Sequence, residues 1–403
     1  MFIRSLSLTN FRAIKRLELD LPDQLTLFYG ENAQGKTSIL EAIHFISLLT
    51  SPITSQDREI VNFFSLDDQP PVCRLVAGIE KKGEMHKLEI RLIINQNQNG
   101  SRRLRKEVLL DGVKRRLYDA VGYFNSVLFI PQMTRIIEDG PDERRKYLDQ
   151  ALSQVYPGYI QALSEYQQGL VRRNALLKQL QESGGDETQL AYYDQLLSEK
   201  GSVIIHARQQ AVSELDHFFT QQHLSITESK ELIRLVYLPS FFPGIDINNL
   251  NHISDSSQKF TDLDAGELKT SFLETLKAGH KREISRGITT IGPHRDDLAF
   301  IANDVDLHVY GSRGQIRSAV MSLKLAETLW FLEKTDELPV ILLDETLAEL
   351  DQQRRGKLLR AISDGWQAIF TTADLRLFSQ EFIKRCAVWE VQEGSLSKNT
   401  PTR

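Results

Sequence analysis

A glycine-rich octapeptide near the N-terminus constrains the fold of this chain more than any other stretch. Residues 30–37 read GENAQGKT and match G-x-x-x-x-G-K-[ST] at every fixed position. The apolar run LTLFY precedes the octapeptide, and helical spacing of apolar residues follows it as far as Ile46. A strand, a glycine turn and a helix in this order point backbone N–H groups at phosphate oxygens. We therefore predict a phosphate-binding loop in preference to a glycine turn with an exposed lysine.

The residue types of the octapeptide suit a nucleotide. Gly30 and Gly35 let the backbone curl inward. Lys36 can reach the β- and γ-phosphates, and the Thr37 hydroxyl can bind Mg²⁺. We predict ATP and Mg²⁺ as cofactors. The predicted nucleotide contacts of this stretch are Gly30, Glu31, Asn32, Ala33, Gln34, Gly35, Lys36, Thr37 and Ser38.

Two apolar runs near the C-terminus end in polar side chains. The run PVILL ends in Asp344 and Glu345, and the run AIF ends in two threonines, of which Thr372 can sense the γ-phosphate. Asp344 can bind Mg²⁺, and Glu345 can orient and polarise the attacking water. Buried strands with an acidic edge are common, but together with GENAQGKT this one indicates a nucleotide hydrolase.

A second glycine-flanked helix start lies at residues 310–315, which read YGSRGQ. Apolar residues with helical spacing follow as far as Trp330, and Ser312 is a natural N-cap. This helix start is therefore also suited to an anion. Arg12 lies in a turn between two predicted N-terminal strands. It either takes part in the chemistry of that hairpin or reaches the nucleotide.

Length and composition narrow the class of protein. A chain of 403 residues exceeds the usual size of a single core, so we expect two domains or one domain with a large insertion. The net charge of −5 means that any contact with nucleic acid depends on local basic patches. Two distant cysteines, no leader pattern and no long apolar run predict a soluble cytoplasmic protein without a structural metal or a membrane span.

Between the motifs lie three further features. The basic stretch Arg102–Arg116 reads as a hairpin with an Asp-Gly turn, which either contacts a phosphate backbone or is a charged, solvated edge. Apolar residues at helical spacing over 163–180 and 193–218 predict an antiparallel helical hairpin, and a further helix is predicted near 267–277. The stretch GPHRDDL at 292–298 is either a turn with local hydrogen bonds or, through His294, a metal or base site.

Several of these stretches together resemble a known family. They are LSLTNFRAI, YGENAQGKTSILEAI, LFIP with GPDERRKYLD, IGPHRDDL, YGSRGQIRSAVMSLKLAE and LLDETLAELDQQRR. The chain is similar to ABC-type ATPases of the SMC kind and more closely resembles the RecF family of recombination mediators. The resemblance covers nearly the whole chain, and the GPHRDDL and SRGQIR stretches are more specific than the phosphate loop.

The resemblance implies an α/β fold, namely an ABC-type, SMC head-like P-loop ATPase domain with an inserted, mainly helical domain. The expected boundaries are 1–132 and 286–403 for the ATPase domain and 133–285 for the insertion. Such ATPases close as head-to-head dimers on two ATP molecules. Ser312, Gly314 and Gln315 would then contact the γ-phosphate at the loop of the opposite subunit, with Asp351 at the dimer seam. Gln132 resembles the glutamine that contacts Mg²⁺.

The resemblance also implies a function and partners. RecF-like proteins bind duplex DNA in an ATP-dependent way and act with RecR and RecO to help load RecA at single-strand gaps. For this chain we expect an ATP-dependent homodimer, double-stranded and gapped DNA as ligands, RecR as a direct partner, and weak, DNA-stimulated ATP hydrolysis in gap repair and replication restart.

Two stretches depart from the family pattern as we expect it. Asp344-Glu345 stands where paired aspartates are usual, although glutamate is the common water-positioning residue in ABC ATPases. Gln132-Met133-Thr134 stands where an acidic pair is expected. The alternatives are the nucleotide-binding subunit of a transporter or another SMC-like machine, and a P-loop kinase. After residue 375 the sequence has no acidic cluster of the kind that would indicate an attached nuclease.

Overall fold

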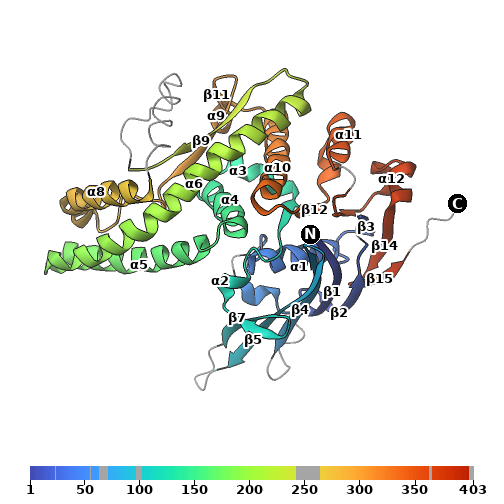
Figure 1. The fold of residues 1–403 in the computed structure, drawn as a ribbon, viewed down its shortest axis with the longest axis horizontal. Helices are drawn as coiled ribbons and strands as arrows, with labels where there is room; N and C mark the ends of the chain where they lie inside the picture. Colours follow the sequence, from blue (N-terminus) through green and yellow to red (C-terminus); the bar gives the residue numbers. More distant parts are fainter. Residues whose placement is uncertain are drawn as a thin grey trace. The chain divides into compact units, whose positions relative to one another are not determined.

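The computed structural model describes residues 1–22, 24–54, 56–62, 71–96, 102–241, 264–362 and 365–398 (Figure 1). The chain divides into two compact units. The first unit consists of Met1–Met133 and Lys324–Arg403, and the second unit is Thr134–Leu323. Within the described ranges, the helices are all too short or too polar to cross a membrane.

An antiparallel sheet in the first unit has the strand order β2-β1-β4-β5-β6-β7. The strands are β1 (Phe2–Phe11), β2 (Ile14–Asp20), β4 (Val72–Lys81), β5 (Glu84–Gln96), β6 (Arg102–Leu110) and β7 (Val113–Arg115). Apolar side chains alternate along them because one face of the sheet is buried. In β1 the buried positions pass from odd to even numbers after Ile3, where the pairing with β4 shifts by one residue.

A second, mostly parallel sheet has the order β15-β14-β3-β13-β12-β8, in which only β14 and β15 are antiparallel neighbours. The strands are β3 (Leu25–Tyr29), β8 (Ser126–Phe129), β12 (Val340–Asp344), β13 (Ala368–Thr372), β14 (Cys386–Gln392) and β15 (Ser395–Lys398). The central strands β12 and β13 are buried along their whole length and begin as apolar runs, as expected for strands covered on both faces. The carboxyl ends of β3, β13 and β12 lie at one edge, where ligands of such sheets bind.

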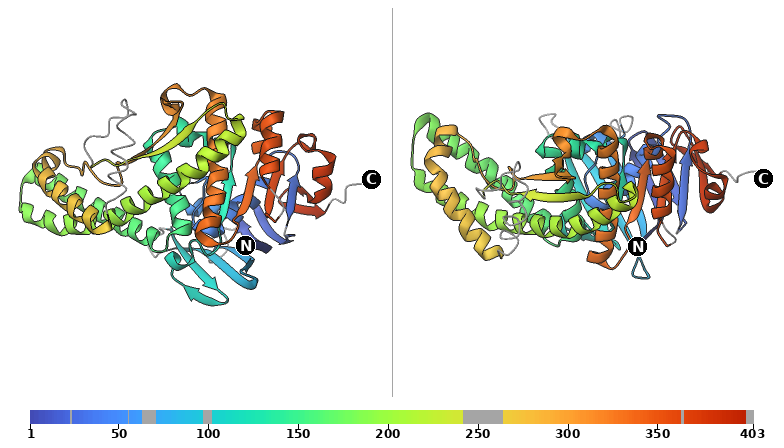
Figure 2. Two further views of the ribbon diagram at one scale, coloured as in Figure 1. Left: turned by 45° about the horizontal axis from the view of Figure 1, so that its top comes forward. Right: turned by 90° about the horizontal axis from the view of Figure 1, so that it is seen from above.

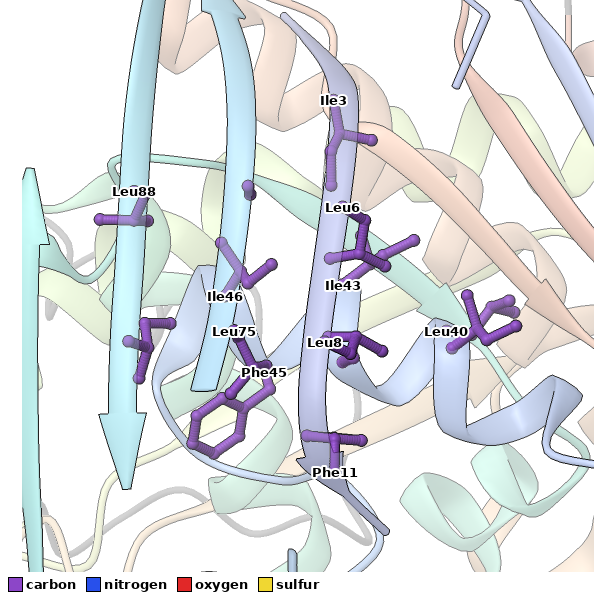
Figure 3. Close-up of a cluster of buried hydrophobic side chains, with 14 of the residues drawn as sticks. Ile3, Leu6, Leu8, Phe11, Leu40, Ile43, Phe45, Ile46, Leu75 and Leu88 are labelled. Carbon is purple, nitrogen blue, oxygen red and sulfur yellow. The ribbon is translucent and has the colours of Figure 1, made fainter. Parts of the chain in front are cut away.

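Helix α1 (Lys36–Leu48) contacts strands of both sheets, so nearly all its side chains are buried. Ile43, Phe45 and Ile46 lie near Leu8 and Leu75 of the antiparallel sheet (Figure 3). The phosphate loop is thereby attached to a helix that cannot move without disturbing the core. The remaining short elements of this unit are η1 (Asp57–Ile60), α2 (Leu117–Ala120), η5 (Thr346–Glu349), α11 (Gln352–Ala361), η6 (Leu375–Leu377) and α12 (Gln380–Arg385), and η3 (Pro131–Thr134) lies at the unit boundary.

His44 of α1 gives the first unit a predictable sensitivity to acid. Its side chain is buried and bonded to Ser126 Oγ at 2.9 Å, and burial, aided by the charge of Lys324, lowers its pKa to about 3. The folded state therefore favours neutral His44, whereas the unfolded chain takes up a proton below about pH 6.5. This contribution to stability is complete above pH 6.5 and is lost as the pH falls toward 3.

As the pH falls from 7 to 5, proton uptake by His44 in the unfolded chain should lower the free energy of unfolding by about 2 kcal/mol. Urea unfolding at several pH values measures this slope. His44→Gln should flatten this slope. His217→Gln, the same replacement at an exposed histidine, is the control. An equally steep slope in His44→Gln would show that other groups cause the acid sensitivity.

The second unit is mainly helical. It contains α3 (Arg135–Glu138), α4 (Pro141–Val155), α5 (Tyr159–Ser183), η4 (Glu187–Gln189), α6 (Leu190–Thr227), β9 (Ile233–Leu238), α8 (Ala265–Arg286), β10 (Asp297–Ala302), β11 (Val305–Asp306), α9 (Leu307–Tyr310) and the first part of α10 (Arg313–Thr335). Helices α5 and α6 form the predicted hairpin, and α8, which contains the helix predicted near 267–277, packs against both (Figure 2). The three strands pair in the order β11-β10-β9.

Arg173 interrupts the apolar stripe of α5, yet its side chain is fully buried. It binds Asp194 of α6 and Glu283 of α8, at 2.9 and 2.6 Å, and also the Thr289 hydroxyl. A buried charge of this kind needs every partner, because removal of one carboxylate leaves the remaining charges uncompensated. The charged residue therefore joins the three helices instead of marking a solvent-facing position.

The GPHRDDL stretch forms a turn, but its hydrogen bonds reach distant elements. Asp296 is buried and accepts from the Tyr237 hydroxyl and from Ser240 N, and Arg144 of α4 binds Asp297 with two nitrogens. His294 bonds to the Tyr166 hydroxyl at 2.8 Å, and burial lowers its pKa to about 4. These partners favour the turn interpretation, and the stretch combines local hydrogen bonds, such as Arg295 N to the Gly292 carbonyl, with bonds to distant elements.

The second compact unit begins within one residue of the predicted start of the insertion at 133, but it extends to Leu323, beyond the predicted end at residue 285. Residues after 285 stay with the second unit because β10 pairs with β9 along six positions, from Asp297↔Leu238 to Ala302↔Ile233. Helix α10 begins in the second unit and ends in the first. The pairing of β10 with β9, which is distant in the sequence, thus keeps the residues after 285 in the second unit. No local sequence signal marks this division.

The basic stretch forms β6 and β7 with the predicted turn at Asp111-Gly112, where both residues have positive φ. Glu107 forms ion pairs with Arg105 and with Lys114, and Lys106 pairs with Asp57. Part of the positive charge is thus compensated, as in a protected sheet edge. Contact with a phosphate backbone stays a prediction.

Candidate nucleotide-binding site

The predicted phosphate loop connects β3 to α1. Tyr29 ends the strand, Lys36 begins the helix, and Gly35 is the N-cap residue. Gly30, Ala33 and Gly35 have φ values of 154°, 64° and 103°, so the backbone turns through conformations that glycine adopts easily. The prediction of a strand, loop and helix is confirmed. The free N–H groups of the first helical turn make this loop suitable for an anion.

A hairpin at the C-terminal end of the sheet supports the loop, and sequence analysis missed it. The turn between β14 and β15 donates two hydrogen bonds to Gln34, from Glu393 N to Oε1 at 2.7 Å and from Gly394 N to the carbonyl at 2.9 Å. The carbonyl oxygen of Val391 lies where a side chain on Gly30 would be. The contacts join residues more than 350 positions apart, so no local pattern predicts them.

Gly30→Ala is expected to weaken nucleotide binding. A Cβ atom at position 30 would lie 2.4 Å from the Val391 carbonyl oxygen, and φ of 154° is strained for alanine. The loop has to shift to relieve this contact. ATP affinity measured by calorimetry should fall at least about tenfold while circular dichroism stays native. Gly83→Ala is the control, because Gly83 also has positive φ but a Cβ atom added there would meet nothing within 4 Å. Unchanged affinity in Gly30→Ala would contradict the expectation.

Lys36 begins the helix, but its buried side chain reaches back into the loop. Its Nζ atom donates to the carbonyls of Gly30 and Glu31, both at 2.8 Å, and lies 3.1 Å from Glu345 Oε1. The ammonium group is thus held between the loop and the acidic end of β12. Glu345 itself has φ of 51°, an uncommon backbone conformation for glutamate and one that is concentrated at functional sites.

Thr37 and Asp344 form a cluster of oxygen atoms beside Lys36. The Thr37 hydroxyl lies 2.9 Å from both carboxylate oxygens of Asp344, and the Thr371 hydroxyl donates to Oδ1 at 2.7 Å. Burial, with a smaller effect of the Glu345 charge, raises the pKa of Asp344. Hard oxygen donors around a desolvated carboxylate fit Mg²⁺. Thr371, which also accepts from Glu345 N at 3.1 Å, is a further residue that sequence analysis missed.

The other predicted residues of the first unit lie on neighbouring elements. Gln132 is exposed in η3, and Asp351 is the N-cap of α11, where it binds Arg354. Thr372 is buried at the end of β13 and bonds to the backbone of Asp374. Arg12 binds Glu41 of α1 with two nitrogens and the Glu59 carbonyl with a third, which supports its structural interpretation. A nucleotide contact of these residues stays a prediction, as it does for Glu31, Asn32 and Ser38.

The second predicted anion-binding helix start belongs to the second unit. Ser312 N donates to Gln315 Oε1 at 3.0 Å, and Gln315 N donates to Ser312 Oγ at 3.3 Å, so the two residues cap the start of α10 reciprocally. The Ser312 N-cap prediction is confirmed. Gly314 lies in the first turn, and its carbonyl accepts from Ser318. The Ser312 side chain is exposed.

Comparison with known proteins shows a likeness over the whole chain. Residues 2–395 match the RecF/RecN/SMC N terminal domain. The DNA replication and repair protein RecF of Chloroflexus aurantiacus is 35% identical over 405 residues, which cover 98% of this chain and 99% of that protein.

Solved structures give the same result for the fold. The structure of the recombination mediator protein RecF with ATP in the RecFOR pathway has a TM-score of 0.82 and 28% identity, and covers 99% of this chain and 98% of that chain. An SMC head bound to the C-terminal winged-helix domain of ScpA has a TM-score of 0.51 at 14% identity, with 99% and 98% covered. The predicted α/β fold of the ABC-type, SMC head-like class is confirmed.

Proposed function

Because this chain belongs to the RecF family, we propose that it is a cytoplasmic, ATP-dependent recombination mediator that closes as a homodimer on duplex DNA near single-strand gaps. One observation carries the proposal. The chain has two helix starts built for anions, the phosphate loop before α1 and the Ser312–Gln315 start of α10, one in each compact unit. A single nucleotide bound at its own loop needs only one of them.

The phosphate loop and Lys36 would bind the triphosphate. The first N–H groups of a helix have no acceptor within it and are suited to phosphate oxygens, and Lys36 Nζ is held by two loop carbonyls. When a nucleotide binds, Lys36 can exchange its ion pair with Glu345 for phosphate oxygens, which leaves the Glu345 carboxylate free to accept a proton. Loss of the ion pair on binding thus couples nucleotide entry to activation of the base.

Thr37 and Asp344 would hold Mg²⁺, with Thr371 orienting the Asp344 carboxylate. A metal held there would supply positive charge against the phosphates. Glu345 would accept the proton of the attacking water, since it follows Asp344 directly and its backbone is fixed by the bond to Thr371. Gln132 and Thr372 are proposed to contact the metal and the γ-phosphate, respectively. Turnover is expected to be slow and stimulated by DNA.

Dimer closure would bring Ser312, Gly314 and Gln315 of one copy to the γ-phosphate bound by the other. Reciprocal capping leaves the Ser312 hydroxyl exposed and its hydrogen free, because Oγ serves as an acceptor for Gln315 N. Asp351 is also exposed and is proposed to lie at the seam between the copies. ATP binding would drive closure, and hydrolysis would reopen the dimer.

Partners follow from the family and stay part of the proposal. The protein is expected to bind double-stranded and gapped DNA, to contact RecR and to act through RecO in the loading of RecA. The basic clusters at residues 102–116 and 144–146 are candidates for the DNA contact, although Arg144 and Arg145 bind acidic or carbonyl groups of their own unit.

Sedimentation of the purified protein tests the proposal. It is measured with and without ATP and Mg²⁺, and with and without a gapped duplex. We expect a change from monomer to dimer that requires ATP and is strengthened by DNA. A constant mass that does not respond to DNA would contradict the clamp and would favour a nucleotide-binding subunit of another machine.

A further inference from the structure

We propose that Glu231 is a positioning residue for the Ser312–Gln315 helix start, and that it fixes the side-chain amide of Gln315 so that the Ser312 hydroxyl is presented to a γ-phosphate. Glu231 lies in the loop between α6 and β9, outside the stretches by which the chain resembles its family. The inference rests on the proposed dimer, since it concerns the site that would bind the nucleotide of a second copy.

The orientation of the Gln315 amide is determined by its two partners. Its Oε1 atom accepts from Ser312 N, so its Nε2 atom must find an acceptor elsewhere. Glu231 Oε1 lies 2.5 Å from Nε2. A carboxylate can only accept hydrogen bonds, so it rejects the flipped amide, in which two oxygens would face each other. Glu231 thereby keeps Gln315 in the rotamer that caps Ser312.

Glu231 is itself held by a buried histidine. Its Oε2 atom lies 2.8 Å from His223 Nε2, and His223 Nδ1 lies 3.1 Å from Ser322 Oγ. Ser322 belongs to α10, and its single hydroxyl hydrogen can be donated either to His223 Nδ1 or to the carbonyl of Ser318 in the same helix. The hydrogen bonds therefore form a closed ring that leaves α10 at Gln315, passes through Glu231 and His223, and returns to α10 at Ser322.

Three members of the ring, Glu231, His223 and Ser322, are buried. His223 is fully buried at the C-terminal part of α6 and also contacts the ring of Phe219, and Glu231 is 9% exposed. Because the carboxylate accepts, His223 Nε2 carries a hydrogen, and burial lowers the pKa of the imidazole despite the opposing charge of Glu231. Both carboxylate oxygens are occupied by donors, which limits repulsion of a phosphate.

A carboxylate of similar structural importance provides the control. Asp216, also on α6, accepts from Leu235 N at 2.6 Å and from Arg234 Nε at 2.8 Å, so it ties α6 to β9. Neither contact leads to Gln315. Asp216→Ala should therefore destabilise the same part of the unit without changing the helix start.

The test compares Glu231→Ala, Gln315→Ala, the double variant and Asp216→Ala. ATP-dependent dimerisation is measured by sedimentation, and ATP binding by the dilute monomer with a fluorescent ATP analogue. Loss of the charged hydrogen bond in Glu231→Ala should raise the protein concentration for half-dimerisation about tenfold. Monomer affinity for the analogue should stay within about twofold, since the phosphate loop is untouched. Asp216→Ala should dimerise like the parent.

The double variant and a conservative replacement separate positioning from general stability. If Glu231 acts through Gln315, adding Glu231→Ala to the Gln315→Ala variant should change the protein concentration for half-dimerisation by less than about twofold. Glu231→Gln should largely restore dimerisation, because its oxygen can accept from Gln315 while His223 changes tautomer. Normal dimerisation of Glu231→Ala, or effects that multiply in the double variant, would overturn the inference. Normal dimerisation of Gln315→Ala would overturn the proposed dimer site itself.

Discussion

Glu345→Gln should reduce ATP turnover by about 10²–10⁴-fold, the range over which a general base contributes. The amide keeps the size of the side chain but cannot accept the proton of the attacking water. It also removes the carboxylate that lies 3.1 Å from Lys36 Nζ, so Lys36 is free for phosphate oxygens. ATP should therefore bind at least as tightly as in the parent, and the closed dimer should persist on DNA.

Single-turnover hydrolysis and retention of labelled ATP during gel filtration measure these two effects separately. Glu349→Gln is the matched control, because Glu349 is an exposed carboxylate in η5, directly after this site. The control should hydrolyse ATP like the parent. If Glu345→Gln did so as well, Glu345 would not be the residue that activates water.

Ser312→Arg should abolish ATP-dependent dimerisation while leaving ATP binding by the monomer intact. The substitution removes the Oγ acceptor for Gln315 N and places a long cation at a helix N-terminus, where the dipole disfavours positive charge. It also fills the space that a phosphate would enter. Removing one preorganised donor typically costs about 10²–10³-fold, so we expect an effect of this size on the dimerisation constant.

Sedimentation with ATP measures dimerisation, and calorimetry on dilute protein measures nucleotide affinity. Ser312→Thr is the control, because threonine is also an N-cap residue and retains the hydroxyl. It should dimerise within a few-fold of the parent. Normal dimerisation of Ser312→Arg would exclude the composite site, whereas loss of ATP binding would indicate damage beyond the helix start.

Sequence alone predicted the elements whose signals are local. GENAQGKT predicted the loop because glycine positions, a preceding apolar strand and a following helix lie within about twenty residues. The apolar run before Asp344-Glu345 predicted β12, and the helical spacing around Gly184-Gly185 predicted α5 and α6. Ser312 was recognisable as an N-cap because it is a serine directly before residues with helical spacing, and Gln315 N donates to its hydroxyl in the structure.

Side-chain partners that lie far apart in sequence were not predictable in this way. Arg12 had two interpretations until the structure paired it with Glu41. Arg173 interrupts the apolar stripe of α5, yet burial with Asp194 and Glu283 makes it a core residue. In each case the identity of the partner depends on which helices pack together, and a single sequence does not contain that information in its local pattern.

The sequence by itself determined the strand, loop and helix at GENAQGKT and the acidic end of β12, since these depend on short segments whose backbone conformation follows from their own residues, and the class of fold followed from the family resemblance. Tertiary structure alone decided how that site is supported. It brought Gly394 to Gln34, Thr371 to Asp344 and Glu231 to Gln315. These contacts arise from strand order and helix packing, which position segments by burying apolar surface over the whole unit, so the polar partners meet only after the chain has folded.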